Sequence, residues 1–489
     1  MPAINGFLGP SYNGRSSEFL AARTVNLFAE LGTVDGTSKT IISLVGPIGS
    51  AFYANGGASP VRGMYPWNGS LYVVEGSTLS RFTANLQQII LGTLTTSVGR
   101  VLMKDNGLTA SGIGGNQLMI IDGANGYIVD TSDTFSIISD GVFPANPIAL
   151  GYIDGYFVVA AQGSMAAYCS TIYNGLSGYW PFLAVSPIQA EPDIIRVIQN
   201  LNQQLWFIKQ YTSEIWYDAG ISTVLGFPFS RTSAGIINCG TPSPFGVVRA
   251  DNSLAFPATQ WNNDQGEFIG IVELSGSSPV VISPQPITYQ MSKWAPWTDV
   301  FGFSFSLEGH TFGIWTSPSA NQTFMYDFTT QMWFEWSSWT GSPYITGRHF
   351  SNCYAYFNGM HLVGDYASGN INYLSTSLYQ DSGNPIASLR VGPPIFDSNN
   401  LDNVMIESFE LDAEMGVGNP TTSLNPQIAL SYSDDGGHRW STEMLRGLGA
   451  AGQYQNRAIW NNLGSFAQFL PRVAITDNCS RVLTGAYVR

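Results

Sequence analysis

The chain has 489 residues, a formal net charge of −14 and 11% charged residues, where globular chains usually carry about 25%. This length exceeds what one hydrophobic core usually supports, so one large domain with appendages, or two to three domains, is expected. With 34 acidic against 20 basic residues and no run of lysine or arginine, the chain is unsuited to tight nucleic-acid binding, which requires phosphate neutralisation. An acidic wall still suits a passage for DNA, because like charges keep the polymer from adhering.

The composition indicates an all-β protein. The 53 glycines and the 13% aromatic content describe many short strands joined by glycine turns and packed by large rings. No apolar run approaches the roughly 20 residues of a membrane span, and the first residues lack a secretory signal pattern. Cysteines at positions 169, 239, 353 and 479 lie far apart, which favours reduced thiols and synthesis in a cytoplasm.

Residues 1–60 are predicted to be an extended arm rich in Gly, Ser and Pro, with one segment, 17–30, that permits a brief helix or strand. The turn signal Gly46-Pro47 closes the arm. Arms of this kind are usually ordered by a neighbour.

A weak repeat runs through residues 61–390, in which a turn leads into an apolar strand and a second turn into another strand. The apolar strands are expected to begin at 71, 118, 156, 205, 254, 311 and 360, at spacings of 38 to 57 positions. Four-stranded β-propeller blades have repeats of about 40–50 residues. The repeat therefore predicts a propeller of six to seven blades, seven being favoured, whose inner strands are the apolar runs; eight blades stay open.

The Pro-rich segment 278–297 interrupts the repeat and is expected to be a long loop at a blade tip. Its Tyr289, Trp294 and Trp297 form a candidate surface contact, either with a glycan or with another protein or subunit. The tryptophans at 333, 336 and 339 are read as packing between blades, with a sugar platform as the alternative.

Residues 391–489 are predicted to be a β-sandwich-like domain, with a distorted last blade as the alternative. Pro393-Pro394 and the polar run 397–400 mark the boundary. Strands are expected at 404–415, 427–433, 468–476 and 481–488.

An Asp box, with the pattern S-x-D-x-G-x-x-W, follows the strand at 427–433. Its residues are Ser433, Asp435, Gly437 and Trp440. The Asp435 carboxylate can accept backbone N–H groups, the glycines supply positive φ, and Trp440 covers the turn. The box is therefore predicted to close a hairpin and to be structural.

Several short motifs together resemble the tail hub or nozzle proteins of short-tailed phages, often called packaged-DNA-stabilisation proteins. They are Thr24-Val25-Asn26-Leu27, Val61-Arg62-Gly63-Met64, the Asp box and Arg457-Ala458-Ile459-Trp460. The resemblance implies a virion protein that forms a six-fold ring below the portal and its adaptor, also called the head-to-tail connector. It further implies contact with a tail fibre, spike or needle protein, and a channel that retains the genome and later conducts it without specific DNA binding.

The main alternative is a sialidase-like glycoside hydrolase, because Asp boxes and propellers occur together in that class. Such an enzyme needs three arginines that clamp a carboxylate, together with acidic and nucleophilic groups. Arginines 62, 100, 196, 231, 249 and 348 are available, but no pattern selects three. A single box and a shared fold do not make an enzyme, so no catalytic residue is predicted. A host-receptor-binding tail protein is the third hypothesis.

No cofactor or metal site is predicted either. The four histidines, at positions 310, 349, 361 and 438, form no metal-binding pair by spacing. The acidic turn at 434–435 lacks the full spacing of a calcium loop. The glycines at 112, 114 and 115 lack the lysine and helix of a phosphate loop.

Overall fold

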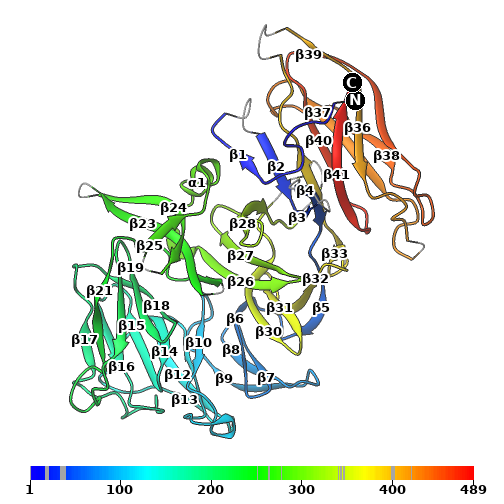
Figure 1. Cartoon of the computed structure of the whole chain (residues 1–489). Coiled ribbons are helices and arrows are strands. Elements are labelled where there is room, and N and C mark those ends of the chain that lie inside the picture. Colours follow the sequence, from blue (N-terminus) through cyan, green and yellow to red (C-terminus); the bar gives the residue numbers. More distant parts are fainter. Residues whose placement is uncertain are drawn as a thin grey trace.

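Seven four-stranded antiparallel sheets surround one axis in the computed structural model, and a two-sheet domain stands at their edge (Figure 1). The structure describes residues 2–16, 21–33, 40–250, 252–262, 265–276, 278–339, 341, 344, 347–397, 402–419 and 421–489. Residues 17–20 of the predicted arm segment and 398–400 of the predicted boundary lie outside these ranges.

Each of the first five blades consists of four consecutive strands paired in chain order. Blade one contains β6 (Val61–Trp67), β7 (Ser70–Glu75), β8 (Thr78–Phe82) and β9 (Gln88–Thr93). Blade two contains β10 (Leu102–Asp105), β11 (Gln117–Ile121), β12 (Gly126–Asp130) and β13 (Phe135–Ile137). Blade three contains β14 (Pro147–Ile153), β15 (Tyr156–Ala161), β16 (Ala166–Cys169) and β17 (Val185–Pro187).

Blades four to six follow the same plan, and blade seven takes its fourth strand from the N-terminal segment. Blade four contains β18 (Ile195–Leu201), β19 (Gln204–Lys209), β20 (Ser213–Asp218) and β21 (Phe229–Ile237). Blade five contains β22 (Val248–Ala250), β23 (Ser253–Asn262), β24 (Gln265–Ser275) and β25 (Ser278–Val281). Blade six contains β26 (Phe301–Leu307), β27 (His310–Ser317), β28 (Gln322–Asp327) and β29 (Met332–Glu335). Blade seven contains β30 (Ser351–Phe357), β31 (Met360–Asp365) and β32 (Asn370–Ser375), and its fourth strand is β5 (Gly49–Asn55).

The apolar runs found in the sequence are the second strands of the blades. The expected starts at 71, 118, 156 and 205 fall in β7, β11, β15 and β19, which are each one strand away from the axis. The prediction that these runs are the inner strands was therefore wrong. A second strand is covered by both neighbouring strands and by the adjacent blades, so it is apolar on both faces, whereas the first strand faces the axial channel.

The N-terminal segment is extended, as predicted, but its described residues pair within their own chain. Strand β5 pairs with β32 to complete blade seven. Strands β2 (Ala21–Val25), β3 (Phe28–Thr33) and β4 (Thr40–Gly46) join the sheets of the edge domain, and β1 (Tyr12–Asn13) pairs with β2. The expectation that a neighbouring subunit orders this segment is wrong for these residues, because their ladder bonds are already made.

The edge domain is a β-sandwich. One sheet has the order β3, β4, β41 (Arg481–Val488), β36 (Val404–Ala413) and β39 (Ala458–Phe466). The other continues blade six through β29 to β2, β35 (Ser388–Val391), β40 (Leu470–Ile475), β37 (Gln427–Ser433) and β38 (Met444–Gly447). The four strands expected in this region are present as β36, β37, β40 and β41, while β38 and β39 were not anticipated.

Adjacent blades pack through separate hydrophobic cores. Leu118 and Val74, for example, belong to the core between blades one and two, and Phe207 and Val158 to that between blades three and four. The core between blades six and seven is continuous with the interior of the sandwich, where Phe312 shares a cluster with Phe409. Propeller and sandwich are therefore joined by a common core as well as by a common sheet.

Candidate functional site

The axis of the propeller contains a cavity of 330 Å³ lined by residues at or beside the first strand of every blade. Tyr65 and Lys104 line it on the side of blades one and two, and Gln199 and Phe301 on the side of blades four and six. None of the described lining residues is an aspartate or glutamate. A sialidase-type site needs an acidic residue and a Tyr/Glu pair beside its arginines, and the described lining of this cavity supplies neither carboxyl group.

Arg62, one of the arginines considered for a carboxylate clamp, is a structural residue. Its guanidinium donates to the carbonyl oxygens of Gly99 and Gly76, both at 2.7 Å, and to Thr96 Oγ1 at 2.8 Å. Burial lowers the pKa of Arg62. The side chain is 3% exposed, and it ties β6 to the connection between blades one and two.

Arg100 is fixed across the cavity. Its guanidinium lies 3.3 Å from the ring centroid of Phe301 and donates to the Asn352 carbonyl at 2.6 Å and to Asn352 Oδ1 at 2.9 Å. Burial lowers the pKa of Arg100 to about 9. Blades two, six and seven are thereby connected across the axis.

The other four arginines do not line the cavity. Arg196 donates to Gln210 Oε1 at 2.9 Å, Arg231 lies 3.8 Å from Glu214, and Arg348 lies 3.7 Å from the ring centroid of Tyr366. Arg249 lies in β22. The described residues therefore contain no clamp of three arginines on the axis.

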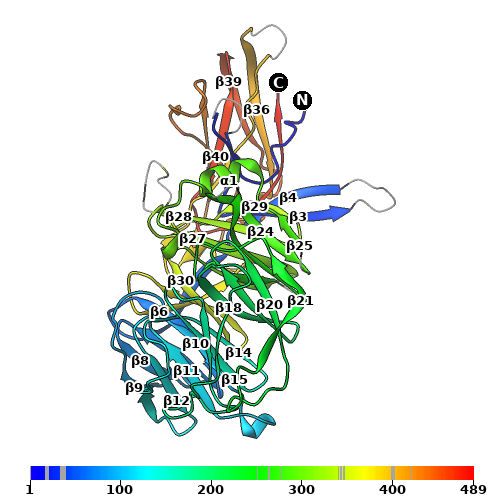
Figure 2. The same cartoon turned by 90° about the vertical axis from the view of Figure 1, so that its left-hand side faces the viewer.

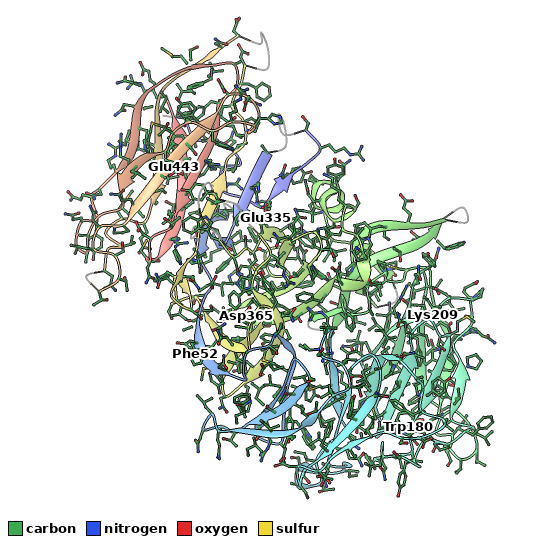
Figure 3. All side chains as sticks on the ribbon, turned by 180° about the vertical axis from the view of Figure 1, so that it is seen from behind. Phe52, Trp180, Lys209, Glu335, Asp365 and Glu443 are labelled. Atoms are coloured by element: carbon green, nitrogen blue, oxygen red, sulfur yellow. The ribbon has the colours of Figure 1, made fainter. Side chains whose placement is uncertain are left out.

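The junction between propeller and sandwich is held by polar contacts that the sequence did not reveal. Strand β2 pairs with β29 through Val25 and Glu335, and Arg23 donates to both Glu335 oxygens at 2.9 and 2.6 Å (Figure 3). A bidentate pair of this kind fixes orientation as well as distance. It locks the outer strand of blade six to the N-terminal segment.

The motif at residues 24–27 lies at the centre of this junction. Asn26 adopts a φ of 54° and donates through Nδ2 to the carbonyls of Ser337 and Ala387, both at 2.9 Å. Its Oδ1 accepts the Ser337 amide at 2.9 Å. One asparagine side chain thus connects the N-terminal segment, the end of blade six and the start of the sandwich.

A buried arginine holds the first ten residues in place. Arg390 of β35 is 1% exposed and donates to the carbonyls of Gly6 at 2.8 Å and Gly9 at 3.0 Å, and to Thr24 Oγ1 at 2.6 Å. Burial lowers the pKa of Arg390 to about 9. A lone arginine gives no local sequence signal for such a role, because its acceptors lie more than 360 residues away along the chain.

A second polar cluster lies where β5, the chain after blade seven and β41 meet. Arg481 donates to Ser388 Oγ at 2.6 Å, and Ser50 Oγ donates to Asp381 Oδ1 at 3.0 Å. Burial raises the pKa of Asp381 to about 7, although Ser50 and the charge of Arg481 oppose this shift. Burial also lowers the pKa of Arg481 to about 10.

The Asp box forms the connection between β37 and β38, which pair as a hairpin. Ser433 Oγ donates to Asp435 Oδ1 at 2.8 Å and accepts the Gly437 amide at 2.9 Å, while Asp435 Oδ1 accepts the Arg439 amide at 2.8 Å. These bonds, that of Arg439 first, lower the pKa of Asp435. Gly437 has a φ of 90°.

Trp440 of the box packs against the sandwich sheet. It contacts the core cluster of Ala21, Val391 and Leu470, and the Arg472 guanidinium lies 4.1 Å from its ring centroid. Since every described contact of the box is with its own turn or sheet, its geometry suits the structural role predicted for it.

Segment 278–297 differs from the predicted surface loop. It forms β25, helix α1 (Gln285–Met291) and the start of a short 3₁₀ helix at Trp297–Asp299. Trp294 is 1% exposed, lies in the core between blades five and six and donates to Gln322 Oε1 at 2.8 Å. Its assignment as a surface contact was wrong, because the segment folds back and fills the gap between two blades.

The other two aromatic residues of this segment are less buried. The ring centroid of Trp297 lies 4.4 Å from that of Phe268. Tyr289 is half-buried, with Lys293 Nζ at 4.0 Å and the Arg15 guanidinium at 4.9 Å from its ring centroid. Trp297 is half-buried as well, so both residues still present part of their surface.

The tryptophan cluster that follows β28 is mostly core. Trp333 and Trp336 are each 2% exposed, which agrees with the packing interpretation, whereas Trp339 is half-buried. Among the described residues no group of histidine, cysteine and carboxylate side chains could hold a metal. In the same part of the chain, no helix has the length and hydropathy of a transmembrane segment.

A hairpin of β3 and β4 projects sideways from the junction (Figure 2). Its strands pair from Phe28 with Val45 to Thr33 with Thr40. Leu31 is 46% and Ile41 50% exposed. Apolar side chains on a projecting hairpin are typical of a surface that another chain covers.

The fold and these contacts define a class: a structural propeller protein with a fused sandwich, whose buried arginines connect blades and domains. The family described as bacteriophage P22 Gp10, beta-propeller, matches residues 6–379, and bacteriophage P22 Gp10, beta-sandwich, matches residues 393–489. The chain belongs to the bacteriophage P22 Gp10 family and is a structural protein of a phage virion tail.

Several solved structures are weakly similar to the chain. The Neurospora crassa Pan2 WD40 domain is 10% identical, with 65% of this chain and 89% of that chain covered and a TM-score of 0.39. Virginiamycin B lyase from Staphylococcus aureus is 9% identical, with 65% and 95% covered and a TM-score of 0.40. The computationally designed Ika8 protein is 9% identical, with 66% and 99% covered and a TM-score of 0.38. At these levels the likenesses imply nothing about function, and no curated protein matches the chain.

Proposed function

We propose that the chain is the tail nozzle of a short-tailed phage. In this role, copies form a six-fold ring below the portal and its adaptor, continue the DNA channel, hold the packaged genome and later conduct it into the host. A tail fibre, spike or needle protein would bind the ring, and the chain itself would catalyse no reaction.

The continuity of the two domains is the observation that carries this proposal. A conduit under load needs subunits that resist bending, and here the ten-stranded sheet and the core of Phe312 and Phe409 join propeller and sandwich. The net charge of −14 supports the same role, because an acidic wall repels DNA and lets it slide.

The test is the size of the particle. Mass photometry and negative-stain class averages of the purified chain, alone and mixed with the adaptor of its phage, are expected to show six-fold rings. A chain that stays monomeric at high concentration and does not associate with the adaptor would contradict the proposal.

The projecting hairpin supplies a matched variant for this test. Replacing Leu31 and Ile41 by Asp should weaken ring formation if the hairpin lies between subunits, since charges would enter an apolar contact. Leu445→Asp is the control, because Leu445 is 53% exposed on a strand of the sandwich. Equal ring formation by both variants would place the subunit contact elsewhere.

Receptor binding is the second candidate function, and it is tested at Tyr289, one of the two half-buried aromatic residues of segment 278–297. Deleting segment 278–297 cannot test it, because that deletion also removes Ile287, Met291 and Trp294 from the core. Tyr289→Ala keeps these residues. Receptor binding predicts normal virion assembly with loss of adsorption, and unchanged adsorption would remove this candidate.

A further inference from the structure

The axial cavity has a charge opposite to that of the whole molecule. Its lining includes Arg62, Arg100 and Lys104 and, among the described residues, no acidic side chain. The chain as a whole carries 34 acidic and 20 basic residues. A cluster of cations that lacks a carboxylate in such a chain requires a physical explanation.

Arg62 and Arg100 differ in the hydrogen-bond partners of their guanidinium groups. The Arg62 guanidinium is surrounded by carbonyl oxygens and by Thr96 Oγ1. Arg100 donates only to Asn352, a neutral residue, and stacks on Phe301. These hydrogen bonds give the Arg100 guanidinium acceptors. No described carboxylate lies within salt-bridge distance to balance its positive charge.

Lys104 is the unusual member of the cluster. It lies on β10 on the same face as Leu102, since side chains alternate along a strand, and both line the cavity. Among the described residues, no acceptor lies within hydrogen-bonding or salt-bridge distance of its ammonium group. The adjacent Asp105 is occupied, because its Oδ2 accepts Tyr65 Oη at 2.7 Å and its Oδ1 accepts the Gly107 amide at 2.9 Å.

The surroundings of Lys104 penalise its charge. Burial lowers the pKa of Lys104, and the nearby positive charge of Arg249 lowers it as well, against an opposing effect of Asp105. Lys104 is half-buried, and a partly desolvated ammonium group without an acceptor is stabilised less than a paired one. A bound anion would remove this cost by supplying both the missing acceptor and the missing negative charge.

We propose that the axial cavity binds a small oxyanion, either phosphate or a carboxylate, with Lys104 as its principal ligand and Arg100 as a second positive charge. The cavity volume of 330 Å³ is at the lower end of the range for small-molecule sites and holds such an anion with a few waters. The site is complete within one subunit, so the proposal does not depend on ring formation.

The experiment is a thermal unfolding series on the full chain at constant ionic strength. Sodium chloride is exchanged for sodium phosphate in one arm and for sodium citrate in the other. Binding to the folded state should raise the wild-type Tm by about 1–3 °C at saturating anion. The arm with the larger rise identifies the oxyanion class.

Lys104→Met and Lys104→Gln are expected to abolish the anion-dependent rise. In chloride alone their Tm should stay close to that of the wild type, because the charge removed is half-buried and has no described partner to lose. Lys293→Met is the matched control, since Lys293 is an exposed lysine outside the cavity, and it should keep the wild-type rise.

Two results would overturn the proposal. One is the absence of an anion-dependent rise in the wild type in both arms. The other is an equal rise in the Lys104 variants, which would place the anion elsewhere. Circular dichroism of each variant at 20 °C would establish that the folded states compared are the same.

Discussion

Blades one to five and the unit formed by blades six, seven and the sandwich are built in different ways. Each of the first five blades is made of consecutive strands, so its partners are close in sequence. Blade seven needs β5, which lies more than 300 residues before β32, and the sandwich needs β2, β3 and β4. Local pairing makes the first region modular, whereas the second is complete only when both ends of the chain are present.

The polar contacts follow the same division. In blade four, the buried pair of Lys209 and Glu214 joins residues five positions apart. At the junction, Arg23 and Glu335 are 312 positions apart, and Arg390 and Phe7 are 383 apart. Closing loops of this length costs conformational entropy, so the second region depends more strongly on a few connecting residues.

The largest expected effect comes from removing the first 57 residues. Hydrogen exchange of this variant should show loss of protection in β30, β31, β32 and the sandwich strands, because each loses a paired strand or its core. Blades one to five should retain most of their protection. The control is a chain ending at residue 391, which keeps β5 and should therefore keep blade seven. If blade seven kept wild-type protection in the variant without residues 1–57, its proposed dependence on β5 would be contradicted.

A smaller effect is expected from Lys209→Met inside blade four. Both side chains of the Lys209–Glu214 pair are fully buried, and removing one partner of such a pair typically costs about 3–5 kcal/mol. The partly exposed Arg231, at 3.8 Å from Glu214, offsets part of this loss. Chemical denaturation should show this loss in the free energy of unfolding. Adding Glu214→Gln should recover most of it, because the remaining amide oxygen can still accept the Ala190 amide that now bonds Glu214 at 3.0 Å. A double variant as unstable as the single one would show that the loss is due to packing.

The smallest effect concerns Asp381, where β5 meets the chain after blade seven. Burial raises the pKa of Asp381 from 3.8 to about 7, so the folded state binds more protons than the unfolded state between these two values. Stability from this group is therefore present below pH 4 and is lost as the pH rises to 7. Asp381→Asn should remove this slope and raise the free energy of unfolding at pH 8 by roughly 1–3 kcal/mol. Denaturant titrations at pH 5 and pH 8 measure the difference, and an unchanged slope would contradict the assignment.

The sequence was most informative where structure is local. The apolar second strands such as β7 and β11 were visible because a fully buried strand leaves a continuous apolar run. The Asp box was visible because its bonds span only a few residues. Its turn geometry at Ser433 and Asp435 follows directly from the residue types.

Long-range contacts left no comparable signal. The role of Arg390 depends on carbonyls in residues 6–10, and that of Asn26 on the carbonyls of Ser337 and Ala387. Trp294 was misread for a related reason. An aromatic residue in a Pro-rich segment has the same local pattern whether the segment projects or folds back. Trp294 is buried because the segment fills the space between blades five and six, which the local sequence does not show.

The pairing of β4 with β41 has a consequence for how the molecule is made. Translation delivers β4 (Thr40–Gly46) more than 400 residues before its partner β41 (Arg481–Val488). During translation β4 and β5 must wait while the intervening blades emerge, and their unpaired edges are exposed to aggregation and to chaperones meanwhile. A product from an interrupted message would keep these edges open, so the fold itself distinguishes finished from unfinished copies.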